Sequence, residues 1–325
     1  SSADQSAAGS NFNYYEPTSL ADSQHNYGGK FKYHLEGRFA SGAEGEHKRI
    51  WMMDCATCRA NRIVIMIGEP DNESYVLEYV ETQDNSPGAY DKRSHSLVQA
   101  TNYSNGYKVE YLGNKGVTRF FYPTLPVVSL PSVVKQFNDK DVYENKISQT
   151  TTSGNPRADW FYVTELITTG RQTPNITSLN VTNSDGYAGE INWTVIGNSY
   201  KDYVVAKKDT SANLTLQYSN INLSTDSRVS IVRIALNGTV SNFAVFNATY
   251  LDVNNAQLLR SNEPISASVG IGIQIQTING TLSGARIFSN SSSFIIPGNS
   301  SVVLVDGQNG SYTQEGNYVS LGNPN

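Results

Sequence analysis

Residues 229–251 read VSIVRIALNGTVSNFAVFNATYL, two apolar runs that are joined by Asn237 and Gly238. The runs, Val229–Leu236 and Thr239–Leu251, are rich in Val, Ile, Phe and Thr, the residue types that favour β-strands. Asn-Gly between two such runs is typical of the tight turn of a hairpin. The stretch therefore predicts two neighbouring antiparallel strands.

The rest of the second half repeats this pattern, with apolar or alternating runs separated by Asn-Gly, Asp-Gly or Asn-Ser. The further strands expected there are 175–181, 190–196, 203–207, 214–218, 266–278, 286–288 and 301–305. Gly270 and Gly272 lie inside one of these runs, without the helix that would make them a phosphate loop. Strands at such spacing predict a two-sheet sandwich of the immunoglobulin-like or jelly-roll-like kind.

Shorter β-like runs, bounded by Gly, Asn, Asp or Pro, begin at Lys30 in the first half. The strands expected there are 31–39, 49–53, 62–67, 74–80, 107–112, 118–122 and 160–167. Ser132–Lys146 is the one stretch that predicts a helix, because its valines and Phe137 fall near one helical face and Pro131 precedes it. The fold class predicted is all-β, with two β-sandwich domains.

Composition divides the chain into three parts. Residues 1–28 are polar and rich in Gly, Ser and Asn, which predicts an extended N-terminal tail. An N-terminal β domain is expected at 29–168, and a C-terminal β-sandwich domain at 169–325. A connector rich in Thr, Ser, Gly and Pro, from about residue 148 to 174, surrounds the boundary.

Charge is sparse: charged residues make up 16% of the chain, against roughly 25% in soluble domains. The net charge is −5 and the pI about 5.4, so the chain has no basic field to attract nucleic acid or an anionic membrane. No apolar run approaches the ~20 residues of a membrane helix, and no membrane span is expected. Sparse carboxylates also suit acid surroundings, which protonate few groups that have native partners.

The acceptor motif for N-linked glycans, Asn-X-Ser/Thr, occurs thirteen times. Its asparagines are Asn72, Asn102, Asn175, Asn180, Asn192, Asn213, Asn222, Asn237, Asn247, Asn279, Asn290, Asn299 and Asn309. Before residue 170 the motif holds 2 of 12 asparagines, and from there on it holds 11 of 21, well above chance. We therefore predict a secreted, cell-surface glycoprotein whose signal peptide has been removed ahead of Ser1.

Several of these motifs lie in or beside expected strands. In Asn213-Leu-Thr, Asn222-Leu-Ser and Asn247-Ala-Thr, the Asn and the hydroxyl residue share one face of the strand, and the apolar residue between them points to the other. An attached sugar is then expected on the solvated side of the sheet.

Cys55 and Cys58 form a Cys-X-X-Cys motif, the one cysteine pair of the chain. A redox motif normally opens a helix after a strand, whereas the surroundings here are β-like. Arg59 stands where a c-type haem site needs His. His34 and His47 could complete a metal site, but zinc sites usually offer a second tight pair of ligands. A local turn disulfide, or a pair of plain thiols, is the preferred interpretation.

Common catalytic signatures are absent. The four histidines, His25, His34, His47 and His95, form no His-Glu-X-X-His, and Gly-X-Ser-X-Gly does not occur. Ser132-Val-Val-Lys135 matches Ser-X-X-Lys, but its valines suit a core. Asn183-Ser-Asp-Gly with Glu190 resembles part of a Ca²⁺ loop, although ordinary turn chemistry explains it better. We predict no enzyme, and no catalytic residue, metal or cofactor.

Aromatic clusters leave one other possibility open. Tyr14-Tyr15, Phe120–Tyr122 and Trp160–Tyr162 could form a sugar-binding platform, although aromatic strand residues more often belong to the core. Glycoside hydrolysis needs only two carboxylates, and this chain contains many.

Many sequons, low charge, abundant Tyr, Asn, Thr, Val and Ile, and only two cysteines form an unusual combination. In composition the chain, mainly over residues 170–325, resembles glycosylated surface proteins of archaea, namely S-layer components and extracellular thread or pilus subunits built from β-sandwiches. The resemblance implies a structural subunit that polymerises with copies of itself. Threads of that kind assemble by donating an N-terminal strand to the next subunit.

The function expected is therefore that of a structural subunit of an extracellular filament or surface layer. In the tail, Phe12 and Tyr14 alternate with asparagines, and this stretch is the candidate donor strand. A tail folded onto its own domain is the competing arrangement. A glycan-binding adhesin or lectin is the alternative function, followed by a carboxylate-dependent glycosidase.

Overall fold

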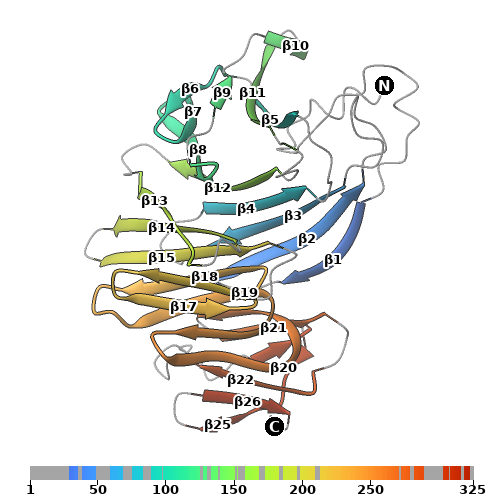
Figure 1. Ribbon diagram of the computed structural model, residues 1–325, viewed down its shortest axis with the longest axis vertical. Coiled ribbons are helices and arrows are strands. Elements are labelled where there is room, and N and C mark those ends of the chain that lie inside the picture. Colours follow the sequence, from blue (N-terminus) through green and yellow to red (C-terminus); the bar gives the residue numbers. More distant parts are fainter. Residues whose placement is uncertain are drawn as a thin grey trace. The chain divides into compact units, whose positions relative to one another are not determined.

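The protein is all-β, as the sequence predicts (Figure 1). A computed structural model of the chain describes residues 29–35, 39–48, 59–68, 75–82, 89–96, 98–124, 127–129, 133–137, 140–150, 152, 158–167, 173–182, 186–195, 198–208, 213–270, 272–278, 282–288, 303–306, 308–315 and 318–322. These residues form 26 strands and no helix, and hence no helix long and apolar enough to cross a membrane. The predicted tail, 1–28, and the expected strand at 49–53 lie outside them.

The strands belong to three sheets. An eight-stranded sheet has the order β1 (Gly29–Leu35), β2 (Ala40–Lys48), β3 (Arg59–Ile67), β4 (Tyr75–Thr82), β12 (Asp159–Ile167), β8 (Asn114–Tyr122), β7 (Gly106–Tyr111) and β6 (Thr101–Tyr103). A four-stranded sheet has the order β10 (Val133–Phe137), β11 (Lys140–Thr150) and β5 (Ala89–Ser96), with β9 (Val127–Ser129) also paired to β11.

The third sheet has fourteen strands. Its main path runs through β13 (Asn175–Leu179), β14 (Gly186–Val195), β15 (Asn198–Lys207), β18 (Val229–Ala235), β19 (Val240–Val253), β20 (Ala256–Gly270), β21 (Gly272–Thr277), β23 (Val303–Val305) and β24 (Gln308–Asn309). Five further strands branch from it: β16 (Leu214–Tyr218), β17 (Ile221–Thr225), β22 (Gly284–Phe288), β25 (Thr313–Glu315) and β26 (Tyr318–Gly322).

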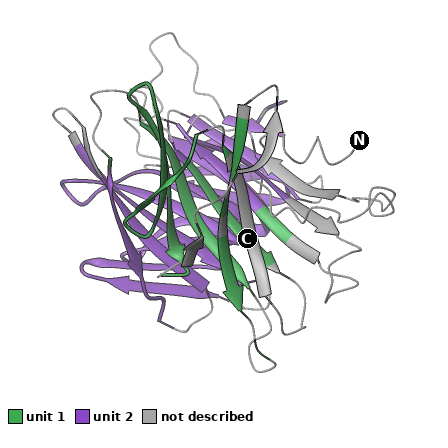
Figure 2. Ribbon diagram, turned by 90° about the horizontal axis from the view of Figure 1, so that it is seen from above, with its two compact units in different colours: residues 1–31, 45–62, 76–173 green, residues 32–44, 63–75, 174–325 purple. Residues whose placement is uncertain are grey.

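The chain forms two compact units (Figure 2). The first contains residues 1–31, 45–62 and 76–173, and the second contains 32–44, 63–75 and 174–325. Two segments of the first half of the chain thus belong to the second unit. The domain boundary expected at residues 168 and 169 stays a prediction.

The first unit has a core between its two sheets. Buried side chains from β4, β7, β8 and β12 of the eight-stranded sheet pack with Ile147 of β11 in the four-stranded sheet. They include Val80, Tyr107, Phe120, Trp160 and Tyr162. On the opposite face of β8 and β12, Phe121 and Phe161 stack with ring centroids 5.1 Å apart. Sheets that face each other across such a layer form a sandwich.

In the second unit, β18 is buried on both faces. Its burial is continuous from Val229 to Ile234, which explains why the sequence there is mostly apolar, with Ser230 and Arg233 as the exceptions. Val232 and Ile234 point into a core with β14–β17, β19–β23 and β26. The first apolar run of residues 229–251 thus forms a central strand, β18, that is buried on both faces.

Described residues of segments 32–44 and 63–75 contact the other face of β18 and its neighbours. The backbone N–H of Ala40 donates a hydrogen bond to Ser268 Oγ at 3.0 Å. A Cβ atom on Gly42 would lie 2.6 Å from the carbonyl oxygen of Val64 and 3.0 Å from the Phe246 ring. Because glycine has no Cβ atom, β2 can approach Phe246 of the fourteen-stranded sheet this closely.

A buried ion pair lies in this interface. Arg233 donates to Asp202 through Nε at 2.6 Å and through Nη2 at 2.7 Å, and the two residues are directly opposite in β18 and β15. Tyr75 Oη donates to the same carboxylate at 2.9 Å, and the guanidinium lies 5.1 Å from the Phe39 ring centroid. The side chains of Arg233 and Asp202 are 3% and 0% exposed. Two buried charges are tolerated because each has its partner.

Turn geometry follows the residue types. Asn254 and Asn255, between β19 and β20, both have positive φ angles (50° and 65°), as a two-residue hairpin turn requires. The expectation of one continuous strand over 266–278 is wrong. β20 ends at Gly270 and β21 begins at Gly272, and these two glycines pair with each other across a hairpin. Gly272 has a φ of 135°, a conformation that favours glycine.

The expectation of a helix over Ser132–Lys146 is also wrong. The stretch forms β10 and most of β11, with Phe137 paired to Lys140. β11 also pairs with β5 from Tyr143 to Thr150. The β-branched valines favour strands, and pairing on both sides of β11 satisfies its backbone without a helix. Four apolar residues at roughly helical spacing fit two short strands equally well.

We expect the loss of one partner of the Arg233–Asp202 pair to destabilise the fold strongly. Arg233→Leu leaves a buried carboxylate without its cation and should lower the free energy of unfolding by about 3–5 kcal/mol. The free energy of unfolding should fall less in the double variant Asp202→Leu/Arg233→Leu than in either single variant, because no unpaired charge remains. Urea unfolding measures both.

Lys108→Ala provides the control, since Lys108 and Glu110 form an ion pair at 3.5 Å whose side chains are 30% and 46% exposed. Loss of this exposed ion pair should lower the free energy of unfolding by about 1 kcal/mol or less. Equal stability of wild type and Arg233→Leu would refute the assignment.

Candidate functional site

The structure describes the side chains of eight sequon asparagines, and none of them is buried. Asn102, Asn175, Asn180, Asn213, Asn222 and Asn237 are exposed, and Asn192 and Asn247 are half-buried. Among the residues described, the buried asparagines are Asn61 and Asn145, and neither is followed by Ser or Thr at the second position. All eight positions therefore leave room for a hydrophilic sugar that must remain in water.

Asn237 illustrates the exposed sequons. It lies in the turn between β18 and β19, where Gly238 has a φ of 81°. Asn237 Oδ1 accepts hydrogen bonds from the backbone N–H of Thr239 at 3.1 Å and from Thr239 Oγ1 at 2.6 Å. The amide and hydroxyl groups of this sequon thus contact each other on a protruding turn.

Asn247 lies in a more constrained place, a bulge of β19 opposite β20. It has a φ of 55°, and its backbone N–H donates to Ser266 Oγ at 3.1 Å. Thr249, the hydroxyl residue of this sequon, donates through Oγ1 to Asp226 at 2.5 Å. Hydrogen bonds of the folded chain therefore fix both Asn247 and Thr249 of this sequon.

Three sequons gather at one edge of the fourteen-stranded sheet. Among the described strands, β13 pairs with β14 alone and so ends the sheet. Asn175 is the first residue of β13, and Asn180 follows its last residue. Asn175 also lies directly opposite Asn192 of β14, which places two acceptor side chains on the same face at neighbouring positions.

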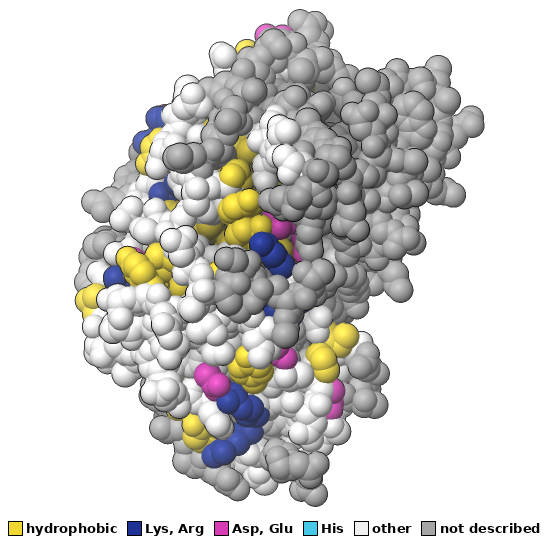
Figure 3. All heavy atoms as spheres, in the orientation of Figure 1, with side chains coloured by type: hydrophobic (Ala, Val, Ile, Leu, Met, Phe, Trp, Pro, Cys, Tyr) yellow, Lys and Arg dark blue, Asp and Glu magenta, His cyan; other side chains and the backbone are white. Residues whose placement is uncertain are grey.

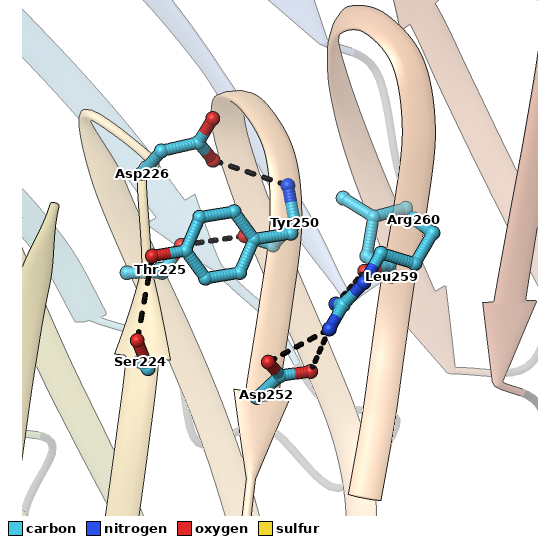
Figure 4. Close-up of polar contacts among 7 residues, drawn as sticks. All are labelled: Ser224, Thr225, Asp226, Tyr250, Asp252, Leu259 and Arg260. Atoms are coloured by element: carbon cyan, nitrogen blue, oxygen red, sulfur yellow. Dashed lines mark hydrogen bonds and ion pairs between the residues drawn. The ribbon is translucent and has the colours of Figure 1, made fainter. Parts of the chain in front are cut away.

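A polar cluster around β19 connects three strands (Figure 4). Asp226 Oδ1 accepts the backbone N–H groups of Thr249 and Tyr250 at 2.9 and 3.1 Å. Thr225 Oγ1 donates to the Tyr250 carbonyl oxygen at 2.8 Å, and Tyr250 Oη lies 3.3 Å from Ser224 Oγ. Because the Asp226 carboxylate satisfies backbone groups that the bulge leaves unpaired, its role is structural.

Beside this cluster, Arg260 lies over the Tyr250 ring, 5.4 Å from its centroid. Its Nη2 is 2.8 Å from both carboxylate oxygens of Asp252, and its Nη1 donates to the Leu259 carbonyl oxygen at 2.7 Å. One strand further, Arg286 of β22 lies over Tyr318 of β26, 4.0 Å from the ring centroid. Two neighbouring arginines, each lying over a tyrosine ring, thus occupy this part of the sheet.

The first unit contains a second buried ion pair, on β8 and β12. Arg119 Nη2 donates to Glu165 Oε2 at 2.6 Å, and the side chains are 6% and 2% exposed. Glu165 Oε1 is buried without a hydrogen-bond partner in the described part of the chain. Burial raises the pKa of Glu165 to about 7, although the charge and hydrogen bond of Arg119 act to lower it.

Several residues singled out from the sequence lie outside the described residues, so the structure leaves their predicted roles untested. They are Phe12, Tyr14, Tyr15, Cys55, Cys58, Asn72, Asn279, Asn290, Asn299, Ser132, Asn183 and the side chains of His25, His34, His47, His95, Lys135 and Asn309. Within the described part, no group of three or more His, Cys, Asp or Glu side chains could hold a metal ion.

Most of the aromatic strand residues singled out belong to the core rather than to a platform. Phe120, Phe121 and Trp160–Tyr162 are all at most 2% exposed, so they offer no surface to a sugar, whereas Tyr122 is half-buried. Tyr250 and Tyr318, which are among the aromatic residues that contact charged groups nearer the surface, were not singled out from the sequence. Each contacts an arginine on a neighbouring strand, a proximity that depends on strand pairing and has no local signal.

Comparisons with known proteins assign no family to the chain. No protein-family model matches the chain, and no curated protein matches it. Among solved structures, a crystal structure of heparinase III is similar, with 13% sequence identity and a TM-score of 0.38. The similarity covers 53% of this chain and 26% of that one, and it carries no argument about function.

We expect most of the eleven sequons from Asn175 onward to carry glycans in the native protein. Peptide mapping should find modification at the exposed sites, including Asn213 and Asn237, whereas Asn61 and Asn145 serve as unmodified controls. Intact mass before and after deglycosylation gives the total. A native mass equal to the bare 35.6 kDa chain would contradict the prediction.

Glu165 should make the protein more stable in acid. Between pH 4.5 and 7 the unfolded chain releases this proton and the folded chain retains it, so the free energy of unfolding falls as pH rises and levels off above 7. The contribution over this window is roughly 3 kcal/mol, from about 1.4 kcal/mol per pKa unit.

Urea unfolding from pH 4 to 8 tests this, comparing wild type with Glu165→Gln. The variant cannot titrate at this position and should lose that part of the pH dependence. Glu110→Gln, at an exposed carboxylate, should leave the profile unchanged. Identical profiles for wild type and Glu165→Gln would contradict the assignment.

Proposed function

We propose that this protein is an N-glycosylated structural subunit of an extracellular filament or surface layer, assembled from copies of itself. The observation that carries the proposal is the placement of the sequons: all eight asparagines described stand at exposed or half-buried positions. Random sequons in a chain this rich in asparagine would also fall at buried sites such as Asn61 and Asn145. With 16% charged residues, the chain needs neutral hydrophilic groups on its surface, which glycans supply.

The edge strand β13 also supports a role in ordered assembly. An exposed sheet edge pairs readily with another chain and must be protected in a protein that is kept at high local concentration. Glycans on Asn175 and Asn180 would stand at both ends of β13, and one on Asn192 would stand beside it. Sugar at this edge would prevent uncontrolled edge pairing and leave assembly to another part of the chain.

The charged residues of the interior fit a framework rather than a reactive centre. The Asp202–Arg233 and Arg119–Glu165 side chains are at most 6% exposed, so a substrate in solution does not reach them. The carboxylate of Asp226, which is half-buried, already accepts three donors from β19. These groups hold strands in place, and we propose no enzymatic role for them.

Assembly itself is assigned to the N-terminal tail. An extended segment can add backbone hydrogen bonds to the open edge of a neighbour's sheet, with alternate side chains filling pockets. Phe12 and Tyr14 are the side chains that would do so in this chain. Since the tail lies outside the described residues, this step rests on the sequence alone.

Electron microscopy of native material tests the proposal, and filaments or sheets are the expected result. Monodisperse monomers would overturn it. Deleting residues 1–20 should abolish assembly while the Tm of the folded body stays unchanged, because the strands described begin at Gly29. Unchanged assembly by the deletion variant would remove the tail from the mechanism and leave the structural role intact.

A further inference from the structure

One end of a face of the eight-stranded sheet is apolar and open. Leu166 of β12 lies directly opposite Gly116 of β8, which lies opposite Val109 of β7. Directly opposed residues of antiparallel strands point to the same face, so these three residues form one row, the apolar row. Val109 packs against the core of the first unit, whereas Leu166 is 71% exposed. Apart from its chain neighbours, a Cβ atom on Gly116 would meet no described residue within 4 Å.

Further apolar side chains lie beside this row. Tyr111 follows Val109 by two residues in β7 and therefore points to the same face. Of the six exposed large hydrophobic side chains in the described part of the chain, three lie at this end of the sheet: Tyr111, Leu112 and Leu166. In Figure 3, which has the orientation of Figure 1, hydrophobic side chains reach the surface over the strands of this sheet. Apolar surface gathered in this way indicates a contact with another group.

The charged residues of β7 lie on its other face. Lys108 and Glu110 alternate with Val109 and form an ion pair with each other at 3.5 Å. Lys108 Nζ also lies 5.9 Å from the centroid of the Tyr103 ring. These side chains therefore do not cover the apolar row.

A glycosylation motif lies one row away, on the same face. Asn102 of β6 is directly opposite Tyr107 of β7, which is opposite Thr118 of β8. Tyr107 and Thr118 are each only 5% exposed, whereas Asn102 is exposed. Diagonal neighbours on adjacent strands, such as Asn102 and Val109, are about 7–8 Å apart. A sugar attached to Asn102 therefore finds its own row buried and the apolar row open within its reach.

The rest of this motif suits modification. Tyr103 points to the opposite face, toward Lys108, and leaves the side of Asn102 clear. Ser104, the hydroxyl residue, is exposed in the turn between β6 and β7, with a φ of 48°. The motif is one of the two that precede residue 170, where their frequency alone gives no reason to expect a glycan. Its position on the sheet supplies that reason.

We propose that Asn102 carries an N-glycan whose first sugars cover Val109, Gly116 and Leu166 and stack on the Tyr111 ring. A sugar ring bears C–H groups on its faces and hydroxyl groups around its rim. Its faces remove apolar and aromatic surface from water while the hydroxyl groups stay solvated. The glycan thus covers the open end of the core of the first unit. This inference rests on the proposed N-glycosylation of the protein, but not on its assembly.

Peptide mapping of the native protein is the first test, and we expect a glycan on Asn102 as well as on Asn237. An unmodified Asn102 beside a modified Asn237 would overturn the inference, leave the proposed function standing and assign the apolar row to a second copy of the chain. A native protein without sugar on any motif would overturn both.

The thermal stability of the full-length Ser104→Asn variant tests the packing of the glycan. The substitution removes the motif and keeps a residue type that tolerates a positive φ. In the glycosylating host, the variant should have a Tm about 2–4 °C below that of wild type. In a host without N-glycosylation, the two chains should have equal Tm values. Asn102→Gln removes the same glycan by another substitution and should reproduce the loss. Equal Tm values for wild type and both variants in the glycosylating host would overturn the inference.

Tyr111→Thr tests whether the sugars lie on the apolar row. The Tm difference between the glycosylated and unglycosylated Asn102 forms should fall by half or more in this background, because the stacking ring is absent. Leu236→Thr is the matched control, since Leu236 is 76% exposed beside Asn237, and it should leave the difference unchanged. An unchanged difference in Tyr111→Thr would show that the glycan does not contact the row.

Discussion

The Asp202–Arg233 ion pair is the constraint on which the second unit depends. It lies between the central strands β15 and β18 and the covering segments 32–44 and 63–75, where both side chains are almost fully buried. A one-residue slip between β15 and β18 would move one charge to the opposite, apolar face and leave both without partners. The pair therefore specifies register, while Tyr75 and Phe39 extend the same network to the covering layer.

Around this interior, the protein distributes polarity in an uncommon way. Apolar side chains cover both faces of β18, and few charged residues remain for the surface. Asparagines of the glycosylation motif occupy turns, strand ends and edge positions instead, such as Asn237, Asn180 and Asn175. A surface made hydrophilic by neutral groups changes little with pH, whereas the burial of Glu165 makes the folded state more stable in acid.

Patterns confined to a short stretch predicted the structure well where both faces of a strand are buried. The run from Val229 to Ile234 was correctly predicted as a strand, because its β-branched residues and the Asn-Gly turn that follows both favour a β-hairpin. The same reasoning failed for Ser132–Lys146, where valines at roughly helical spacing belong to two paired strands. It also failed at Gly270 and Gly272, since strand-like residues on both sides of the two glycines do not reveal that the chain reverses direction there. In both cases consecutive strands pair with each other across a hairpin, and residue types alone do not reveal where the chain turns back.

By itself the sequence determined the all-β class, most strand positions and the glycosylation motifs, because these depend on residue type and on neighbours along the chain. Only the tertiary structure decided that segments 32–44 and 63–75 join the second unit, and that Asp202 meets Arg233. It also decided that Arg260 stands beside Arg286 with tyrosines on either side. Such contacts join residues far apart in sequence, and they follow from strand register, which hydrogen bonds and burial across the whole sheet select together.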